Sequence, residues 1–141
     1  MTLTEDMVSV ILSRPLLARI ATINPQTLQP MVVPFWYLWD GNQIWMVEYH
    51  GSHQFQILGV ADKCVVVIDN DEENQILKGL LVEGEMVPVT YPETLVEEMI
   101  TKIYISYLGE TGVQDEQTQA WIHDPEKRIY RLQPTEAYSW K

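Results

Sequence analysis

Antiparallel pairing of neighbouring strands is the strongest constraint that this sequence places on its fold. Short turns rich in Asn, Gly and Pro separate its apolar runs: NPQTLQP is one, and Asp40-Gly41-Asn42 is a typical β-hairpin turn. Connections this short cannot hold a parallel crossover, so these strands pair antiparallel. The predicted strands span residues 16–23, 31–39, 43–49, 63–70, 75–90 and 128–134. The fourth run, KCVVVIDN, is apolar enough to predict burial on both faces.

Helical periodicity appears at the start of the chain and between the later strands. Apolar residues recur at the 3.6-residue period before Pro15 and after Pro92. The predicted helices span residues 4–14, 52–60, 92–108 and 115–122. This content predicts a single mainly β (α+β) domain over residues 1–141, built as a closed or nearly closed antiparallel barrel with flanking helices.

The composition restricts the partners of the chain. Its formal net charge is −11, from 20 acidic and 9 basic residues, so we expect no nucleic-acid partner, because that binding requires Lys and Arg. No apolar run of about 18 residues occurs, so we expect no membrane partner. The N-terminus lacks a basic start and a small-residue cleavage site, and Cys64 is the only cysteine. These features predict a cytoplasmic protein.

The sequence does not predict a metal site or a catalytic residue. A metal needs three or four converging ligands, and no Cys or HxxxH spacing supports His50, His53 or His123. A haem-ligating histidine stays open. The acidic run 69–73 lacks the EF-hand spacing, so we interpret it as a solvated turn. No residue has a clear acid–base role, so the catalytic residues are unknown.

Four short motifs follow one another along the first part of the chain: Ala18-Arg19-Ile20-Ala21-Thr22, Val32-Val33-Pro34-Phe35-Trp36, Asp40-Gly41 and Gly51-Ser52-His53-Gln54. Taken in order, they resemble the pyridoxamine 5′-phosphate oxidase-like family of FMN-binding split β-barrels. The segments LLVEGEMVPV and RIYRLQPTEAYSW extend the resemblance over nearly the whole chain. It implies a six-stranded antiparallel split β-barrel with flanking helices that forms a homodimer. FMN, or in some relatives a deazaflavin, would lie between the subunits beside a small-molecule substrate.

The resemblance also implies which residues would meet the flavin ring. The candidates to bond the polar edge of the ring through their backbone are Val33, Pro34, Phe35, Met46 and Val47. Their alternative role is barrel core. The tryptophans are expected in the core or at a dimer interface, and Trp140 is the candidate to reach across the dimer toward a flat ring.

The expected phosphate site departs from the family pattern. The family's turn usually ends in a lysine that pairs with the flavin phosphate, and this chain has Gln54 there. A neutral amide loses the charge-assisted part of that bond. Glu48, at the end of the strand before the turn, is also a candidate site residue, and its carboxylate would repel a phosphate if it pointed into the site. Ser52 and His53 stay candidates to bind the phosphate at a helix start, with a helix N-cap and exposed neighbours as the alternative. Arg19 or Lys63 could supply a cation.

Two functional hypotheses follow. The first is a homodimeric FMN-binding oxidoreductase that acts on an unknown small molecule. The second is a cofactor-free barrel, or one with another ligand, that serves as a binding module. The retained Pro34 and Trp36 motif and the Gly-Ser turn favour the first hypothesis, whereas Gln54 and Glu48 favour the second.

Overall fold

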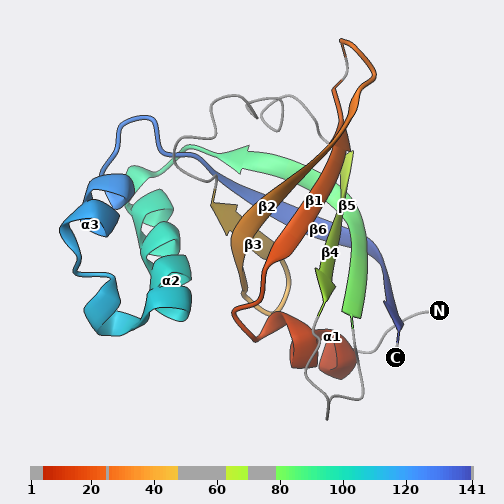
Figure 1. Cartoon of the computed structure of the whole chain (residues 1–141), viewed down its shortest axis with the longest axis horizontal. Helices are drawn as coiled ribbons and strands as arrows, with labels where there is room; N and C mark the ends of the chain where they lie inside the picture. Colours follow the sequence, from red (N-terminus) through yellow and green to blue (C-terminus); the bar gives the residue numbers. More distant parts are fainter. Residues whose placement is uncertain (1–4, 25, 48–62, 70–78, 141) are drawn as a thin grey trace.

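The computed structural model describes residues 5–24, 26–47, 63–69 and 79–140 (Figure 1). Its elements, in chain order, are α1 (Glu5–Leu12), β1 (Ala18–Ile23), β2 (Pro30–Trp39), β3 (Ile44–Val47), β4 (Lys63–Asp69), β5 (Gly79–Val89), α2 (Glu93–Gly112), α3 (Glu116–Ile122) and β6 (Ile129–Trp140). The helix predicted for residues 52–60 lies outside the described residues.

The six described strands form one closed barrel in the order β1-β2-β3-β6-β5-β4, and every neighbouring pair is antiparallel. The Asp40-Gly41 turn joins β2 to β3, and Gly41 has a φ of 97°, a left-handed conformation that glycine adopts at little cost. β5 and β6 pair along their whole length, with an irregularity of register between Glu83 and Gly84. The predicted six-stranded antiparallel barrel is confirmed.

Alternate residues of each strand fill the barrel interior. On β2, for example, Val33, Phe35 and Tyr37 are buried, and the residues between them point outward. α1 contributes Ile11 and Leu12 to this core. The prediction for the fourth strand is wrong in part: β4 buries one face and leaves the other only half-buried.

A second apolar core lies outside the barrel, between the outer face of β2 and β3 and the helices α2 and α3. α2 buries Val96, Met99, Ile100, Ile103 and Tyr104. These side chains pack with outward-facing strand residues such as Trp45 and Val47. Figure 1 shows α2 and α3 together on one side of the barrel, in the connection between β5 and β6.

We call α2 and α3, which lie between β5 and β6, the helical insert. The ends of its helices follow local sequence signals. Pro92 precedes the first residue of α2, where its missing N–H has no intrahelical acceptor to lose. Gly109 interrupts α2 with a φ of 79°. The Asp115 side chain accepts a hydrogen bond from the Gln117 N–H at 3.1 Å and so caps α3. Within the described ranges, the helices are too short or too polar to cross a membrane.

Candidate functional site

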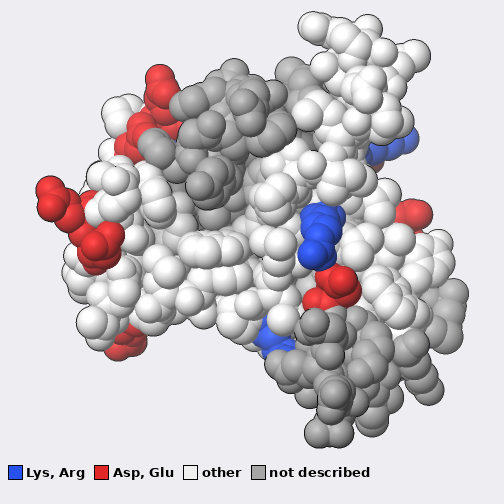
Figure 2. All heavy atoms as spheres, viewed as in Figure 1, with Lys and Arg blue, Asp and Glu red and all other residues white. Residues whose placement is uncertain are grey.

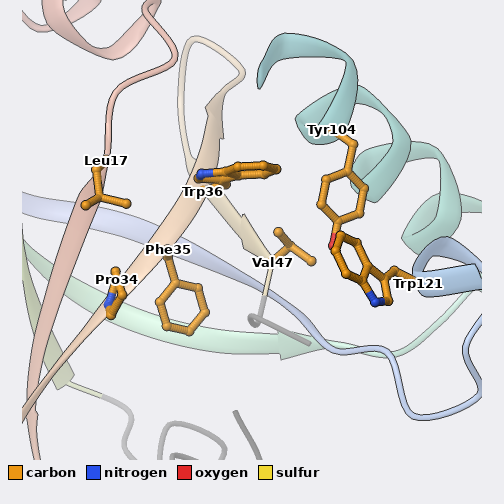
Figure 3. A pocket seen from close by; sticks show the side chains of 7 residues that line it. All are labelled: Leu17, Pro34, Phe35, Trp36, Val47, Tyr104 and Trp121. Atoms are coloured by element: carbon orange, nitrogen blue, oxygen red, sulfur yellow. The ribbon is translucent and has the colours of Figure 1, made fainter. Parts of the chain in front are cut away.

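A cavity of about 340 Å³ lies between the barrel and the helical insert. Its described lining residues are Leu17, Pro34, Phe35, Trp36, Val47, Tyr104 and Trp121, from β2, β3, α2, α3 and the segment before β1 (Figure 3). None of these residues carries a charge. The volume falls in the range of about 300–1,000 Å³ that is usual for small-molecule sites.

Along the edge of β2 next to this cavity, the described strands pair with only part of the strand. Residues 30–35 pair with β1 on one side, whereas β3 pairs with Trp36–Trp39 on the other. Residues 48–62, which follow β3, lie outside the described residues, so the first half of β2 has no described strand along its second edge. The β1–β2 register is continuous through Pro34, so this proline does not mark a bulge.

Aromatic rings line the side of the cavity that faces the helices. The indole of Trp36 stacks on Tyr107 with centroids 4.6 Å apart and planes 7° apart. Tyr104 meets Trp36 edge to face at 5.8 Å, and its ring lies 6.1 Å from that of Trp121. These contacts connect a strand to both helices and hold flat apolar surfaces against the cavity.

The Tyr107 hydroxyl fixes α2 to the barrel. It donates a hydrogen bond to the Leu16 carbonyl at 2.5 Å and accepts one from the Tyr37 N–H at 3.2 Å. The Tyr37 hydroxyl in turn donates to the Arg14 carbonyl at 2.6 Å. Burial raises the pKa of Tyr37 and of Tyr107 well above that of a free tyrosine, so both hydroxyls stay protonated and can donate.

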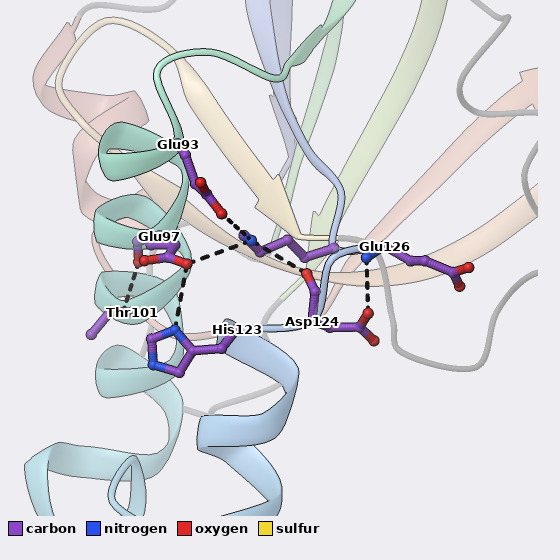
Figure 4. A network of polar contacts seen from close by, with 7 residues as sticks. Glu93, Glu97, Thr101, His123, Asp124 and Glu126 are labelled. Carbon is purple, nitrogen blue, oxygen red and sulfur yellow. Dashed lines mark hydrogen bonds and ion pairs between the residues drawn. The ribbon is translucent and has the colours of Figure 1, made fainter.

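Ionic contacts hold the far end of the insert (Figure 4). The side chain of Lys127, only 9% exposed, lies 3.3 Å from Glu93 and 3.5 Å from Glu97. His123 Nδ1 lies 3.4 Å from the same Glu97 carboxylate. These contacts join the first turns of α2 to the segment after α3 and so help to hold Tyr104 and Trp121 in place beside the barrel.

The structure brings together some of the residues predicted for a flavin ring. Pro34, Phe35 and Val47 line the cavity. The side chains of Val33 and Met46 are fully buried in the barrel core, so their backbone groups alone could meet a ligand. The predicted residues Glu48, Ser52, His53 and Gln54 lie outside the described residues.

Trp140 lies away from the cavity of its own chain. It pairs with Gly79 at the end of β6, and a Cβ at Gly79 would come within 2.0 Å of its ring. The ring therefore covers this glycine and stays 42% exposed. Its predicted reach across a dimer stays a prediction.

Of the two candidate cations for a phosphate, Arg19 already has a partner. Its guanidinium lies 2.5 Å from the Asp69 carboxylate, with both side chains about half exposed. Lys63 pairs across the sheet with Glu85. Arg19 also pairs with Pro34 across β1 and β2, which places its backbone close to the cavity.

Sequence reasoning missed four lining residues. Leu17 and Tyr104 were not singled out, and Trp36 and Trp121 were expected in the core or an interface. Tyr104 belongs to the apolar stripe of α2, whose period is the same for a core residue and for a cavity residue. In the described part of the chain, no group of three or more His, Cys, Asp or Glu side chains could hold a metal ion.

The fold is a closed six-stranded antiparallel β-barrel with a cavity between the barrel and its helices. The family model for pyridoxamine 5′-phosphate oxidase matches residues 3–141, so the chain belongs to this family. No curated protein matches the sequence.

Solved structures agree on the fold. A conserved hypothetical protein from Mycobacterium tuberculosis has a TM-score of 0.74 at 19% identity and covers 99% of this chain and 86% of its own. An F420 reductase has a TM-score of 0.67 at 20% identity over 92% of this chain and 94% of its own. A Clostridium acetobutylicum protein related to general stress protein 26 of B. subtilis, of the pyridoxinephosphate oxidase family, has a TM-score of 0.69 at 14% identity, covering 99% and 91%.

Proposed function

We propose that this protein binds a flavin-type cofactor, FMN or a deazaflavin, and serves as an oxidoreductase for a small molecule. The observation that carries the proposal is the apolar, aromatic-lined cavity beside β2. Membership of the pyridoxamine 5′-phosphate oxidase family supports a flavin-type cofactor, and the F420 reductase of the same fold supports a deazaflavin as an alternative to FMN.

The described residues fit the ring half of such a cofactor. Its polar edge needs hydrogen-bonding groups in a plane, and the backbone of Val33, Pro34 and Phe35 lies along an edge with no described strand partner. Its apolar part needs flat dry surfaces, which Trp36 and Val47 provide. The phosphate half would fall to the turn after Val47, where Gln54 replaces a lysine.

The cofactor, when bound, supplies hydride transfer. The residues of this chain bind the ring, orient it against β2 and exclude water from the cavity. Because none of the described lining residues is an acid or a base apart from the neutral Tyr104 phenol, we assign them no proton transfer.

Titration of FMN against the purified protein tests the proposal, with quenching of flavin fluorescence as the readout. Leu17→Trp places a large ring at the exposed rim of the cavity and should weaken FMN binding about tenfold, or ~1.4 kcal/mol. Val10→Trp, on an exposed position of α1, is the matched control and should leave it unchanged. Equal FMN affinity in both variants would place the flavin elsewhere.

The missing lysine favours the alternative of a barrel that holds no flavin. Gln54→Lys separates the two functions. If the turn holds the phosphate, the variant should bind FMN about tenfold more tightly, because a charge-assisted bond is roughly twice as strong as a neutral one. Riboflavin, which lacks the phosphate, should bind both proteins equally. No binding of FMN by either protein at high micromolar concentration would support the cofactor-free module.

We further propose that the protein forms a homodimer through the outer face of the β1–β2 hairpin. Ile23, Pro30, Val32 and Pro34 lie on this face and are exposed, with Val32 at 63% and Ile23 at 56%. Figure 2 shows the projecting tip of the hairpin without charged side chains, whereas acidic side chains gather over α2 and α3. Arg19 lies on the same face nearer its base, paired with Asp69. Exposed apolar patches of this kind favour association.

Light scattering after gel filtration tests the dimer. Val32→Glu should convert a dimer to a monomer, because it places a charge within the apolar face. Val10→Glu, which changes another exposed valine, on α1, should not. A monomeric wild-type protein at micromolar concentration would contradict the proposal.

A further inference from the structure

The Tyr104 hydroxyl is a donor at the cavity for which the described residues offer no hydrogen-bond partner. Tyr104 is 5% exposed and lines the cavity from α2. Tyr37 and Tyr107, the other tyrosines beside this part of the barrel, both donate to backbone carbonyls. Burial alone raises the pKa of Tyr104, to about 12. The hydroxyl oxygen is not one of the fully enclosed side-chain atoms, so a ligand in the cavity can reach it.

The position of this hydroxyl indicates what it could meet. Figure 3 shows the Tyr104 ring beside Trp36 and Trp121, across the cavity from Phe35 and Pro34. The hydroxyl is uncharged at neutral pH and so can donate one hydrogen bond to an acceptor in the cavity. Aromatic and apolar surfaces around it favour a flat ligand.

The other described lining residues restrict the charge of that ligand. Leu17, Pro34, Phe35 and Val47 have no polar side-chain atom, and the described part of the lining contains no Lys or Arg. A phosphate or carboxylate inserted among these residues would lose its hydration and gain no counter-charge from them, which costs far more than one phenol hydrogen bond returns.

We propose that Tyr104 makes this cavity selective for a substrate that is flat, aromatic and uncharged and that carries a carbonyl-type hydrogen-bond acceptor. This inference rests on the proposed function, because it takes the side of the cavity next to α2 as the place of the substrate, beside a flavin ring that lies against β2. The proposal assigns binding of the flavin ring to the backbone of β2 and selection of the substrate to Tyr104 on α2.

Three probes of matched shape test the proposal by calorimetric titration. Acetylnaphthalene has the acceptor, isopropenylnaphthalene replaces its carbonyl oxygen with carbon, and naphthoate replaces the neutral group with an anion. Tyr104→Phe should weaken acetylnaphthalene binding about fivefold, which is roughly 1 kcal/mol, and leave isopropenylnaphthalene unchanged. Naphthoate should bind the wild-type protein at least about tenfold more weakly than acetylnaphthalene.

Tyr138→Phe is the control variant, because Tyr138 is an exposed residue of β6 outside the cavity lining, and it should change none of these affinities. The proposal is wrong if acetylnaphthalene binds Tyr104→Phe as well as wild type, if naphthoate binds as tightly as the ketone, or if the ketone does not bind. Parallel FMN titrations separate the two ideas. If the protein does not bind FMN but its ketone binding depends on Tyr104, only the flavin proposal is refuted. If the protein binds FMN but its ketone binding does not depend on Tyr104, only the role of Tyr104 is refuted.

Discussion

Replacing Tyr107 with phenylalanine should loosen the attachment of the helical insert to the barrel. The substitution keeps the ring that stacks on Trp36 and removes only the hydroxyl oxygen. That oxygen joins three chain segments, because it donates to the Leu16 carbonyl at 2.5 Å and accepts from the Tyr37 N–H at 3.2 Å. Both backbone groups would be left without this partner.

The two contacts set the expected magnitude. Leaving a buried polar group unsatisfied costs roughly 1–3 kcal/mol, and water that enters recovers part of this cost, so we expect Tyr107→Phe to lower the free energy of unfolding by about 2–3 kcal/mol. With a urea slope near 2 kcal/mol per molar, the unfolding midpoint should fall by roughly 1 M. Tyr104→Phe, one turn earlier on α2, removes a hydroxyl with no described hydrogen-bond partner and should change the midpoint little.

Urea unfolding followed by tryptophan fluorescence measures both variants. If Tyr107→Phe unfolds within about 0.5 kcal/mol of wild type, a range typical of a neutral surface substitution, the hydroxyl does not hold α2 in place. The raised pKa of Tyr107 adds a dependence on pH. The folded state keeps this proton to a higher pH than the unfolded state, whose tyrosine titrates near 10.0. The contribution of Tyr107 is therefore complete below pH 10 and is lost as the pH rises through the folded pKa.

Four further predictions concern the barrel. Gly84→Ala should destabilise the fold by roughly 1–3 kcal/mol, because the new Cβ would lie 2.4 Å from a backbone carbonyl oxygen. Gly79→Ala should cost less in the same urea assay, because its neighbour is an exposed, movable indole ring. Burial raises the pKa of Asp40, but hydrogen bonds from Trp45 and from the turn outweigh this and lower it below 3.8. Asp40→Asn should therefore narrow the stability difference between pH 7 and pH 3, since the Asp40 contribution is lost as the pH falls through the folded pKa. Burial raises the pKa of the Cys64 thiol to about 12, so disulfide reagents should modify it at neutral pH only as fast as the protein unfolds.

The sequence contained enough information for an antiparallel six-stranded barrel but not for every buried face. Turn signals such as Asp40-Gly41 act locally, and the structure has a hairpin there. The run in β4 predicted burial on both faces, but Val65 and Val67 are only half-buried. An apolar run shows that a strand tolerates burial; whether another element covers it depends on the distant segments of the chain.

The candidate site was predictable on the strand side and not on the helix side. Pro34, Phe35 and Val47 were found because they belong to motifs that resemble a known family. Tyr104 and Trp121 come from an insert whose position depends on long-range contacts such as the Tyr107 hydroxyl bridge. Their types and spacing are those of core residues, so periodicity alone could not assign them to a cavity.

The helical insert interrupts two strands that are already neighbours, since β5 and β6 pair along their full length without it. Changes of length or sequence in residues 90–128 can therefore accumulate while the hydrogen-bond ladder of the barrel persists. A relative could change the helical side of the cavity, to which we assign the substrate, and keep the strand side, to which we assign the cofactor. The architecture therefore allows the chemistry to be inherited while the choice of substrate diverges.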